Sequence, residues 1–197
     1  PSYELSRKKI NKQSFRRMIK DNISYLENFS YPEEWIDKNL IPSGIMIANC
    51  AGHEIPISEY IIGTVIALTL DLSRTETGFR NGSWERTGTL SDPETMHGEV
   101  FGKTLGIIGY GLIGIETAKR AKSLGMRVFG INRKAKLNTP EFLDWHGSID
   151  ELDKLLKESD YIVLACDLNE NSQNLINKDT LKKMKKSSYL INISRGN

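Results

Sequence analysis

Three glycines, Gly109, Gly111 and Gly114, follow one another as Gly-x-Gly-x-x-Gly between a strand-like run at 104–108 and a helix-like run at 113–124. At a strand-to-helix junction this spacing allows a tight turn, close approach of the backbone to a pyrophosphate, and close packing of helix on strand. The start of the helix adds free N–H groups and the positive end of its dipole. The spacing therefore predicts a dinucleotide site, and the alternative is that the glycines serve only a tight turn. The residues expected to line the site are Gly109, Tyr110, Gly111, Leu112, Ile113 and Gly114.

The second group of candidate residues is Asn132, Arg133 and Lys134, which follow a strand-like run at 126–131. Dinucleotide-binding units that use NAD usually place an Asp or Glu here, whose carboxylate accepts the adenosine ribose hydroxyls. The amide at this position would not repel a ribose 2′-phosphate, and the two cations that follow could pair with one. We therefore expect NADP in preference to NAD. The alternative is that Arg133 stacks on adenine while Lys134 is solvated.

Three more candidate residues follow two later strands. Arg195 comes after the strand-like run at 189–193, and Cys166 and Asp167 stand at the end of the run at 161–166. Ligands of open parallel sheets bind at the carboxyl ends of the strands, so all three are expected near the cofactor. A guanidinium there could hold a 2-oxo acid by its carboxylate and polarise the carbonyl that receives a hydride. An isolated arginine at a strand end is more commonly a surface residue.

The elements that position these residues alternate between strand and helix. Strand-like runs at 104–108, 126–131, 161–166 and 189–193 are separated by amphipathic segments, and the segment between 131 and 161 opens with a capping-box sequence at 148–151. This alternation predicts an α/β fold with a doubly wound parallel sheet.

The region before residue 99 is less regular. A short strand is expected at 45–48, and a long helix at 60–72, with Ser58 as its cap and apolar residues around most of its circumference. Residues 73–98 are expected to form an extended arm.

Composition excludes several classes of protein. The formal net charge of +2 is too small to indicate a nucleic-acid binder, and the longest apolar run is too short for a membrane span. Two cysteines do not make a disulfide scaffold, and free thiols suit the cytosol. No cluster with metal-ligand spacing is present, so no metal site is expected.

Longer stretches of the sequence are similar to one known family. From about residue 45 to 196 the chain resembles the D-isomer-specific 2-hydroxyacid dehydrogenases, which include glyoxylate and hydroxypyruvate reductases and glycerate and phosphoglycerate dehydrogenases. The stretches that carry the resemblance are Ile-Ser-Glu-Tyr (57–60), Asn-Gly-Ser-Trp (81–84), Gly-Lys-Thr-Leu-Gly-Ile-Ile-Gly-Tyr-Gly-Leu-Ile-Gly (102–114), Leu-Gly-Met-Arg-Val (124–128) and Ile-Asn-Ile-Ser-Arg-Gly (191–196).

The resemblance implies an oxidoreductase that transfers a hydride between NAD(P) and a small D-2-hydroxy or 2-oxo acid. It implies that residues 1–50 are part of a flavodoxin-like substrate domain. Residues 51–197 would be a Rossmann-type NAD(P)-binding domain, incomplete at its C-terminus, with a dimerisation helix and arm at 58–98. Arg195 matches the family's substrate-binding and catalytic arginine, and the usual assembly is a homodimer.

The family's remaining catalytic groups are a Glu and a His that follow the Arg-Gly segment, and the printed chain ends before them. His53, His97 and His146 precede the arginine, so none matches the catalytic histidine in order. We expect the chain as given to bind cofactor but to catalyse poorly. The alternative function is that of a non-catalytic NAD(H)-sensing protein on the same scaffold, like the corepressors that resemble this family.

Overall fold

The computed structural model describes residues 25–28, 46–49, 52–83, 97–135 and 139–194. The chain divides into two compact units, Pro1–Gly52 and His53–Asn197. In the first unit, strands β1 (Tyr25–Asn28) and β2 (Met46–Asn49) pair in parallel, with Tyr25 opposite Met46. The predicted strand at 45–48 corresponds to β2, whereas no strand was expected at β1.

The second unit is built on a five-stranded sheet with the order β5-β4-β3-β6-β7, in which every neighbouring pair is parallel. Its strands are β3 (Thr104–Ile108), β4 (Arg127–Asn132), β5 (Trp145–Ser148), β6 (Tyr161–Leu164) and β7 (Tyr189–Asn192). The chain begins the sheet at the central β3, proceeds outward through β4 to β5, and then crosses β3 to form β6 and β7. This order confirms the predicted doubly wound parallel sheet.

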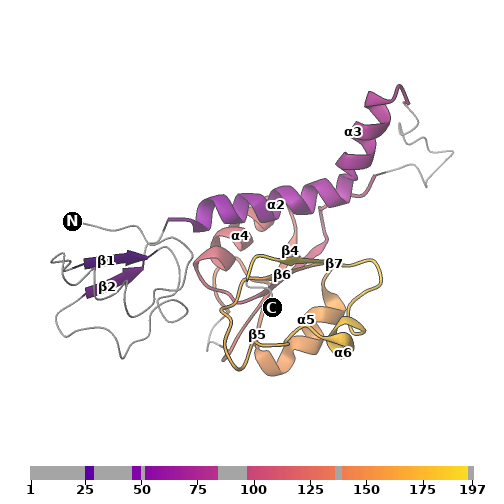
Figure 1. Cartoon of the computed structure of the whole chain (residues 1–197). Helices are drawn as coiled ribbons and strands as arrows, with labels where there is room; N and C mark the ends of the chain where they lie inside the picture. Colours follow the sequence, from indigo (N-terminus) through magenta and orange to yellow (C-terminus); the bar gives the residue numbers. More distant parts are fainter. Residues whose placement is uncertain (1–24, 29–45, 50–51, 84–96, 136–138, 195–197) are drawn as a thin grey trace. The chain divides into compact units, whose positions relative to one another are not determined.

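Helices cover both faces of this sheet, as Figure 1 shows. The helical elements of this unit are α2 (Glu54–Leu70), α3 (Leu72–Arg80), α4 (Leu112–Ser123), the short 3₁₀ turn η4 (Ile149–Glu151), α5 (Leu152–Glu158) and α6 (Lys178–Leu181), of which α3 projects away from the sheet. Helix α2 packs against α4 on one face, and α5 packs on β3 and β4 from the other.

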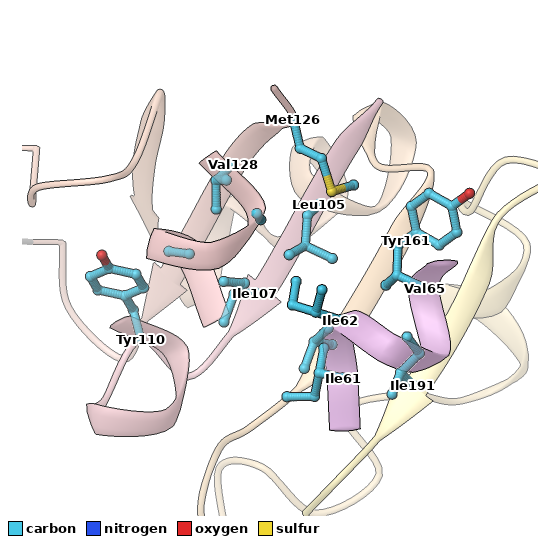
Figure 2. Packing of buried hydrophobic residues seen from close by; sticks show 13 residues of the cluster. Ile61, Ile62, Val65, Leu105, Ile107, Tyr110, Met126, Val128, Tyr161 and Ile191 are labelled. Carbon is cyan, nitrogen blue, oxygen red and sulfur yellow. The ribbon is translucent and has the colours of Figure 1, made fainter. Parts of the chain in front are cut away.

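The core has two parts because the sheet is covered on both faces. Leu105 and Ile107 of β3 join α2 and α4, whereas Ile108 joins the leucines of α5. All five residues of β3 are buried, as expected for a central strand with helices above and below it. Figure 2 shows the larger cluster, which includes Ile61 of α2 and the ring of Tyr110.

Three local predictions are corrected. Ser58 does not cap α2, because the helix begins at Glu54 and the buried Ser58 hydroxyl donates to the Ile55 carbonyl inside the first turns. Residues 73–80 of the expected arm belong to the helix α3, which begins at Leu72 and buries none of its residues. The rest of that arm, at 84–96, lies outside the described residues. Strand β5 was not predicted, since Trp-His-Gly-Ser has no strand-like pattern and pairs only at the edge of the sheet.

Other predictions hold in position. The capping box predicted at 148–151 is present, with the Ser148 N–H donating to a carboxylate oxygen of Glu151 at 3.0 Å.

In the part of the chain that the structure describes, no single helix has the length and composition of a membrane span. The pair α2 and α3 meets these criteria only when taken together, across a bend of 61°.

Candidate functional site

The candidate site lies where the strand order reverses, between β3 and β6. The two strands run in register to their carboxyl ends, with Ile108 opposite Leu164, and the Ala165 N–H donates to the Ile108 carbonyl at 2.8 Å. From this point the chain after β3 continues into α4 and then β4. The chain after β6 continues into α6 and then β7, on the opposite side of β3 in the strand order. Ligands of open α/β sheets bind at such a switch point, because the departing chains leave a crevice there.

Gly109 makes the first turn out of β3 in a conformation that only glycine adopts easily, with φ at +98°. A Cβ at this position would lie 2.6 Å from the Cys166 nitrogen and 2.7 Å from the Ala165 carbonyl oxygen. Its N–H donates to the Ile131 carbonyl of β4 at 2.9 Å. The first glycine is therefore required by the protein's own packing against β6.

The other two glycines differ in what surrounds them. A Cβ at Gly114 would lie 2.9 Å from the Gly109 carbonyl oxygen and 3.3 Å from Cγ2 of Ile107, so this glycine lets α4 pack on the loop and strand. A Cβ at Gly111 would have no atom within 4 Å, and Gly111 has a negative φ of −101°. Packing therefore explains Gly109 and Gly114 but not Gly111.

Helix α4 begins beside that open space. Gly111 is its N-cap, and no side-chain hydrogen bond caps the helix. The N–H groups of the first turn have no partner within a helix, and they carry the positive end of the helix dipole. Leu112 opens the helix and is 62% exposed. Free donors, a positive dipole end and room at Gly111 fit the diphosphate of a dinucleotide.

The predicted neighbours of the loop have different surroundings. Ile113 is partly buried against the larger core cluster. The Tyr110 ring is only 4% exposed, and its hydroxyl donates to the Glu141 carbonyl at 2.6 Å. Asn132 is turned toward the loop, because its side-chain oxygen accepts from the Tyr110 N–H at 2.6 Å. This contact was not predicted, since nothing in the spacing of the two residues along the chain indicates it.

Arg133 and Lys134, which follow Asn132 at the end of β4, are both exposed. No hydrogen bond or ion pair joins either to another described residue, in contrast to Lys122, Lys183 and Lys185, which pair with carboxylates. Two exposed cations therefore stand at the carboxyl end of β4.

Cys166 and Asp167 follow β6 at the switch point of the sheet. Burial raises the pKa of the Cys166 thiol, and a hydrogen bond with Ser194 only partly opposes this, so the thiol is protonated at neutral pH. Asp167 is exposed.

Arg195 lies outside the described residues, but the backbone that leads to it is fixed. The Ile193 N–H donates to the Leu164 carbonyl at 3.1 Å, and the Ser194 hydroxyl donates to the Cys166 carbonyl at 2.7 Å. These bonds bring the chain directly before Arg195 to the carboxyl end of β6. Ser194 was not among the predicted site residues.

The histidines lie elsewhere. His53 precedes α2 and His97 precedes β3, both exposed, and His146 lies on β5, two strands from β3. Within the described ranges, no group of three or more His, Cys, Asp or Glu side chains is arranged to hold a metal ion.

Comparisons with known proteins agree with this geometry. The sequence profile of the "D-isomer specific 2-hydroxyacid dehydrogenase, NAD binding domain" matches residues 62–197. A glyoxylate reductase of Pyrococcus horikoshii is 43% identical over 118 residues, which are 59% of this chain and 35% of the relative. A hydroxypyruvate reductase of Thermotoga maritima is 34% identical over 156 residues, 78% of this chain and 47% of the relative. The chain thus spans less than half the length of these two relatives.

Solved structures share the fold. A D-2-hydroxyisocaproate dehydrogenase superposes with a TM-score of 0.82 at 23% identity, covering 98% of this chain and 57% of the other. An acyclic imino acid reductase in complex with NADPH and D-Arg gives a TM-score of 0.77 at 25% identity, covering all of this chain and 60% of the other. A profile match over more than half of the residues, on a sheet with this switch point and glycine loop, shows that the chain belongs to the D-isomer specific 2-hydroxyacid dehydrogenase family.

Proposed function

We propose that this protein transfers a hydride between a nicotinamide cofactor and a small 2-oxo or D-2-hydroxy acid. The observation that carries the proposal is the open space at Gly111, beside an uncapped helix start and at the switch point of the sheet. Packing leaves this glycine unexplained, and a bound diphosphate explains it. The names of the relatives, glyoxylate reductase and hydroxypyruvate reductase, favour these two 2-oxo acids as substrates.

The residues divide between cofactor and substrate. The first-turn N–H groups of α4 would hold the diphosphate, and the bound cofactor would supply the hydride. Arg195 would bind the substrate carboxylate through two parallel hydrogen bonds and stabilise charge on the carbonyl oxygen. The bond between Ser194 and Cys166 supports this role, because it ties the residue before Arg195 to the chain that leaves β6 at the switch point.

We propose NADP in preference to NAD. Support comes from Arg133 and Lys134, two exposed cations without a described partner at the end of β4, where the adenosine ribose of a Rossmann-bound dinucleotide lies. The imino acid reductase of similar fold was solved with NADPH. Separate fluorescence titrations with NADPH and NADH test this choice, and tighter binding of NADH would overturn it.

A homodimer in the cytosol is part of the same proposal. Helix α2 packs on α4 with one side only, and large apolar side chains of α2 and α3 remain exposed. They are Ile55, Tyr60, Leu68, Leu72 and Phe79. A second copy would cover such a surface, and sedimentation of the full-length protein measures the oligomeric state. The free thiol of Cys166 suits a reducing compartment.

The activity is tested with the full-length protein, by following oxidation of NADPH or NADH in the presence of glyoxylate or hydroxypyruvate. We expect turnover with one of these acids. We expect Arg195→Gln to lower kcat/KM by roughly 10²-fold or more, because a charge-assisted bidentate contact is lost. Cofactor binding without turnover of any 2-oxo acid would contradict the proposal and favour a non-catalytic sensor.

A further inference from the structure

Tyr110, the residue between the first two glycines of the loop, is held through both its peptide and its side chain. The side-chain oxygen of Asn132 accepts from the Tyr110 N–H at 2.6 Å, and the side-chain nitrogen donates to the Tyr110 carbonyl at 3.4 Å. A backbone N–H can only donate, so the amide oxygen must face it, and the amide nitrogen then faces the carbonyl. The side-chain amide of Asn132 thus forms hydrogen bonds with both the backbone N–H and the backbone carbonyl of Tyr110.

The side chain of Tyr110 is held as well, by burial of its ring and by a hydrogen bond of its hydroxyl. Its ring is 4% exposed, and Cβ atoms built at Gly114 and Gly130 would lie 3.5 and 3.4 Å from Cδ2 of the ring. The hydroxyl donates to the Glu141 carbonyl at 2.6 Å. Burial, and secondarily the charge of Glu141, raises the pKa of Tyr110, so the hydroxyl remains a donor at neutral pH. Figure 2 shows the ring at one end of the cluster, and its burial leaves it little surface with which to contact a ligand.

These contacts determine the shape of the loop next to the open position. Gly109 is held by the Ile131 carbonyl and by the backbone after β6, and Tyr110 is held by Asn132 and Glu141. Gly111, the next residue, faces open space. A loop that is ordered before the ligand arrives loses less conformational entropy on binding.

We propose that Asn132 and Tyr110 are positioning residues that hold the glycine loop in its cofactor-binding shape, and that Asn132 acts through the Tyr110 peptide rather than by reading the adenosine ribose. The choice between NADP and NAD then falls to Arg133 and Lys134. This inference rests on the proposed binding of a dinucleotide at the loop.

The first test compares Asn132→Ala with the wild-type full-length protein in fluorescence titrations with NADH and NADPH. Loss of a short hydrogen bond to a part-buried N–H is expected to weaken both cofactors by the same factor, roughly tenfold. Hydrogen exchange of the Tyr110 amide in the cofactor-free protein should become faster. Lys134→Ala should instead weaken NADPH selectively.

The second test uses Tyr110→Phe, which removes only the hydroxyl that bonds to Glu141. We expect both cofactors to bind about threefold more weakly, although the hydroxyl is directed away from the loop. Because both residues act on one loop, the effects of the two substitutions should be non-additive when combined. Simple additivity would contradict a shared role.

Asn177→Ala is the matched control. Asn177 also accepts from backbone N–H groups, those of Asp179 and Thr180, but it does so at the start of α6, away from the glycine loop. Its loss should lower stability and leave both cofactor affinities unchanged.

The outcomes separate the two proposals. A wild-type protein that binds neither cofactor refutes the proposed function, and this inference with it. If the wild type binds but Asn132→Ala binds equally well, only the inference fails. It also fails if the substitution changes the ratio of NADPH to NADH affinity while Tyr110 exchange is unaltered, because Asn132 would then contact the cofactor directly.

Discussion

The parallel strands of the five-stranded sheet end in two edges, an amino-terminal edge and a carboxyl-terminal edge. The two edges differ in whether side chains of the protein bind the backbone N–H groups there. At the amino-terminal edge, Asp160 accepts from the Thr104 N–H at 2.8 Å and from the Lys185 ammonium at 2.7 Å. Asp144 likewise accepts from the Val128 N–H at 2.7 Å and from Lys122. At the carboxyl-terminal edge, the N–H groups at the start of α4 have no side-chain cap.

We infer from this difference that the amino-terminal edge contributes to stability and the carboxyl-terminal edge to ligand binding. At the amino-terminal edge, carboxylates from neighbouring loops accept from N–H groups within the first two residues of β3 and β4, and lysines pair with the carboxylates. Where a ligand is expected, the donors are left free and the space above them is open. Substitutions at the two edges should therefore change different measured quantities.

The largest effect is expected for Gly109→Ala, which should change both stability and cofactor binding. The positive φ and the contact with the backbone after β6 should together lower the free energy of unfolding by about 2–6 kcal/mol. Cofactor binding should be lost as well. Urea denaturation and fluorescence titration measure the two quantities, and an unaltered midpoint would show that the loop can relax.

Asp160→Ala should affect stability alone. Thr104 is fully buried, so removing the carboxylate leaves its N–H without a partner and should cost about 1–3 kcal/mol. Cofactor affinity should stay at the wild-type value. Asp179→Ala is the control, because its ion pair with Lys182 is exposed and should change stability by less than about 0.5 kcal/mol. A loss of affinity in Asp160→Ala would show that the two edges are coupled.

Gly111→Ala should have the converse effect. No atom lies within 4 Å of the added Cβ, so the free energy of unfolding should fall by no more than about 1 kcal/mol, which is the cost of alanine at an N-cap. The methyl group would occupy space proposed for the diphosphate, and the affinity for cofactor should fall by roughly tenfold, since a hydrogen bond to a charged group is disturbed. Unchanged affinity would place the diphosphate elsewhere.

The smallest effect is the pH dependence of the amino-terminal edge. Burial tends to raise the pKa values of Asp144 and Asp160, but hydrogen bonds from lysine and backbone N–H groups outweigh it, and both are lowered from their ordinary value of 3.8. The folded state therefore binds fewer protons than the unfolded state in acid. The stability that these groups add is present above 3.8 and disappears as the pH falls through the lowered values.

Urea denaturation of wild type and Asp160→Asn at several values between about pH 5 and pH 2 measures this dependence. The variant should show a shallower loss of stability with falling pH. An identical slope in the two proteins would mean that other carboxylates dominate.

Much of the fold was predictable because central strands and long helices have strong local patterns. The strand at 104–108 was placed at its observed bounds, and the helix after the glycines within one residue at each end. Strand β5 and helix α3 were missed, since the first is a short edge strand and the second buries none of its residues. Both depend on their surroundings more than on periodicity.

The amino-acid sequence by itself determined the α/β class, the parallel sheet and the location of the glycine loop. The glycine loop follows from spacing within about fifteen neighbouring residues, which is the range over which helix and strand periods operate. The class and the parallel sheet follow from the repetition of such local patterns along residues 104–193. The family followed from longer stretches of the same kind, and the comparisons confirm it.

Only the tertiary structure separated the roles of similar residues. It showed that Gly109 and Gly114 are required by packing while Gly111 is not, and that Asn132 is committed to the Tyr110 peptide. The physical reason is that the contacts of Gly109 with Cys166 and of Tyr110 with Asn132 join segments that follow different strands, and Tyr110 and Asn132 are 22 positions apart along the chain. Contacts of this kind arise from the pairing of β3 with β4 and β6, and no local pattern records them.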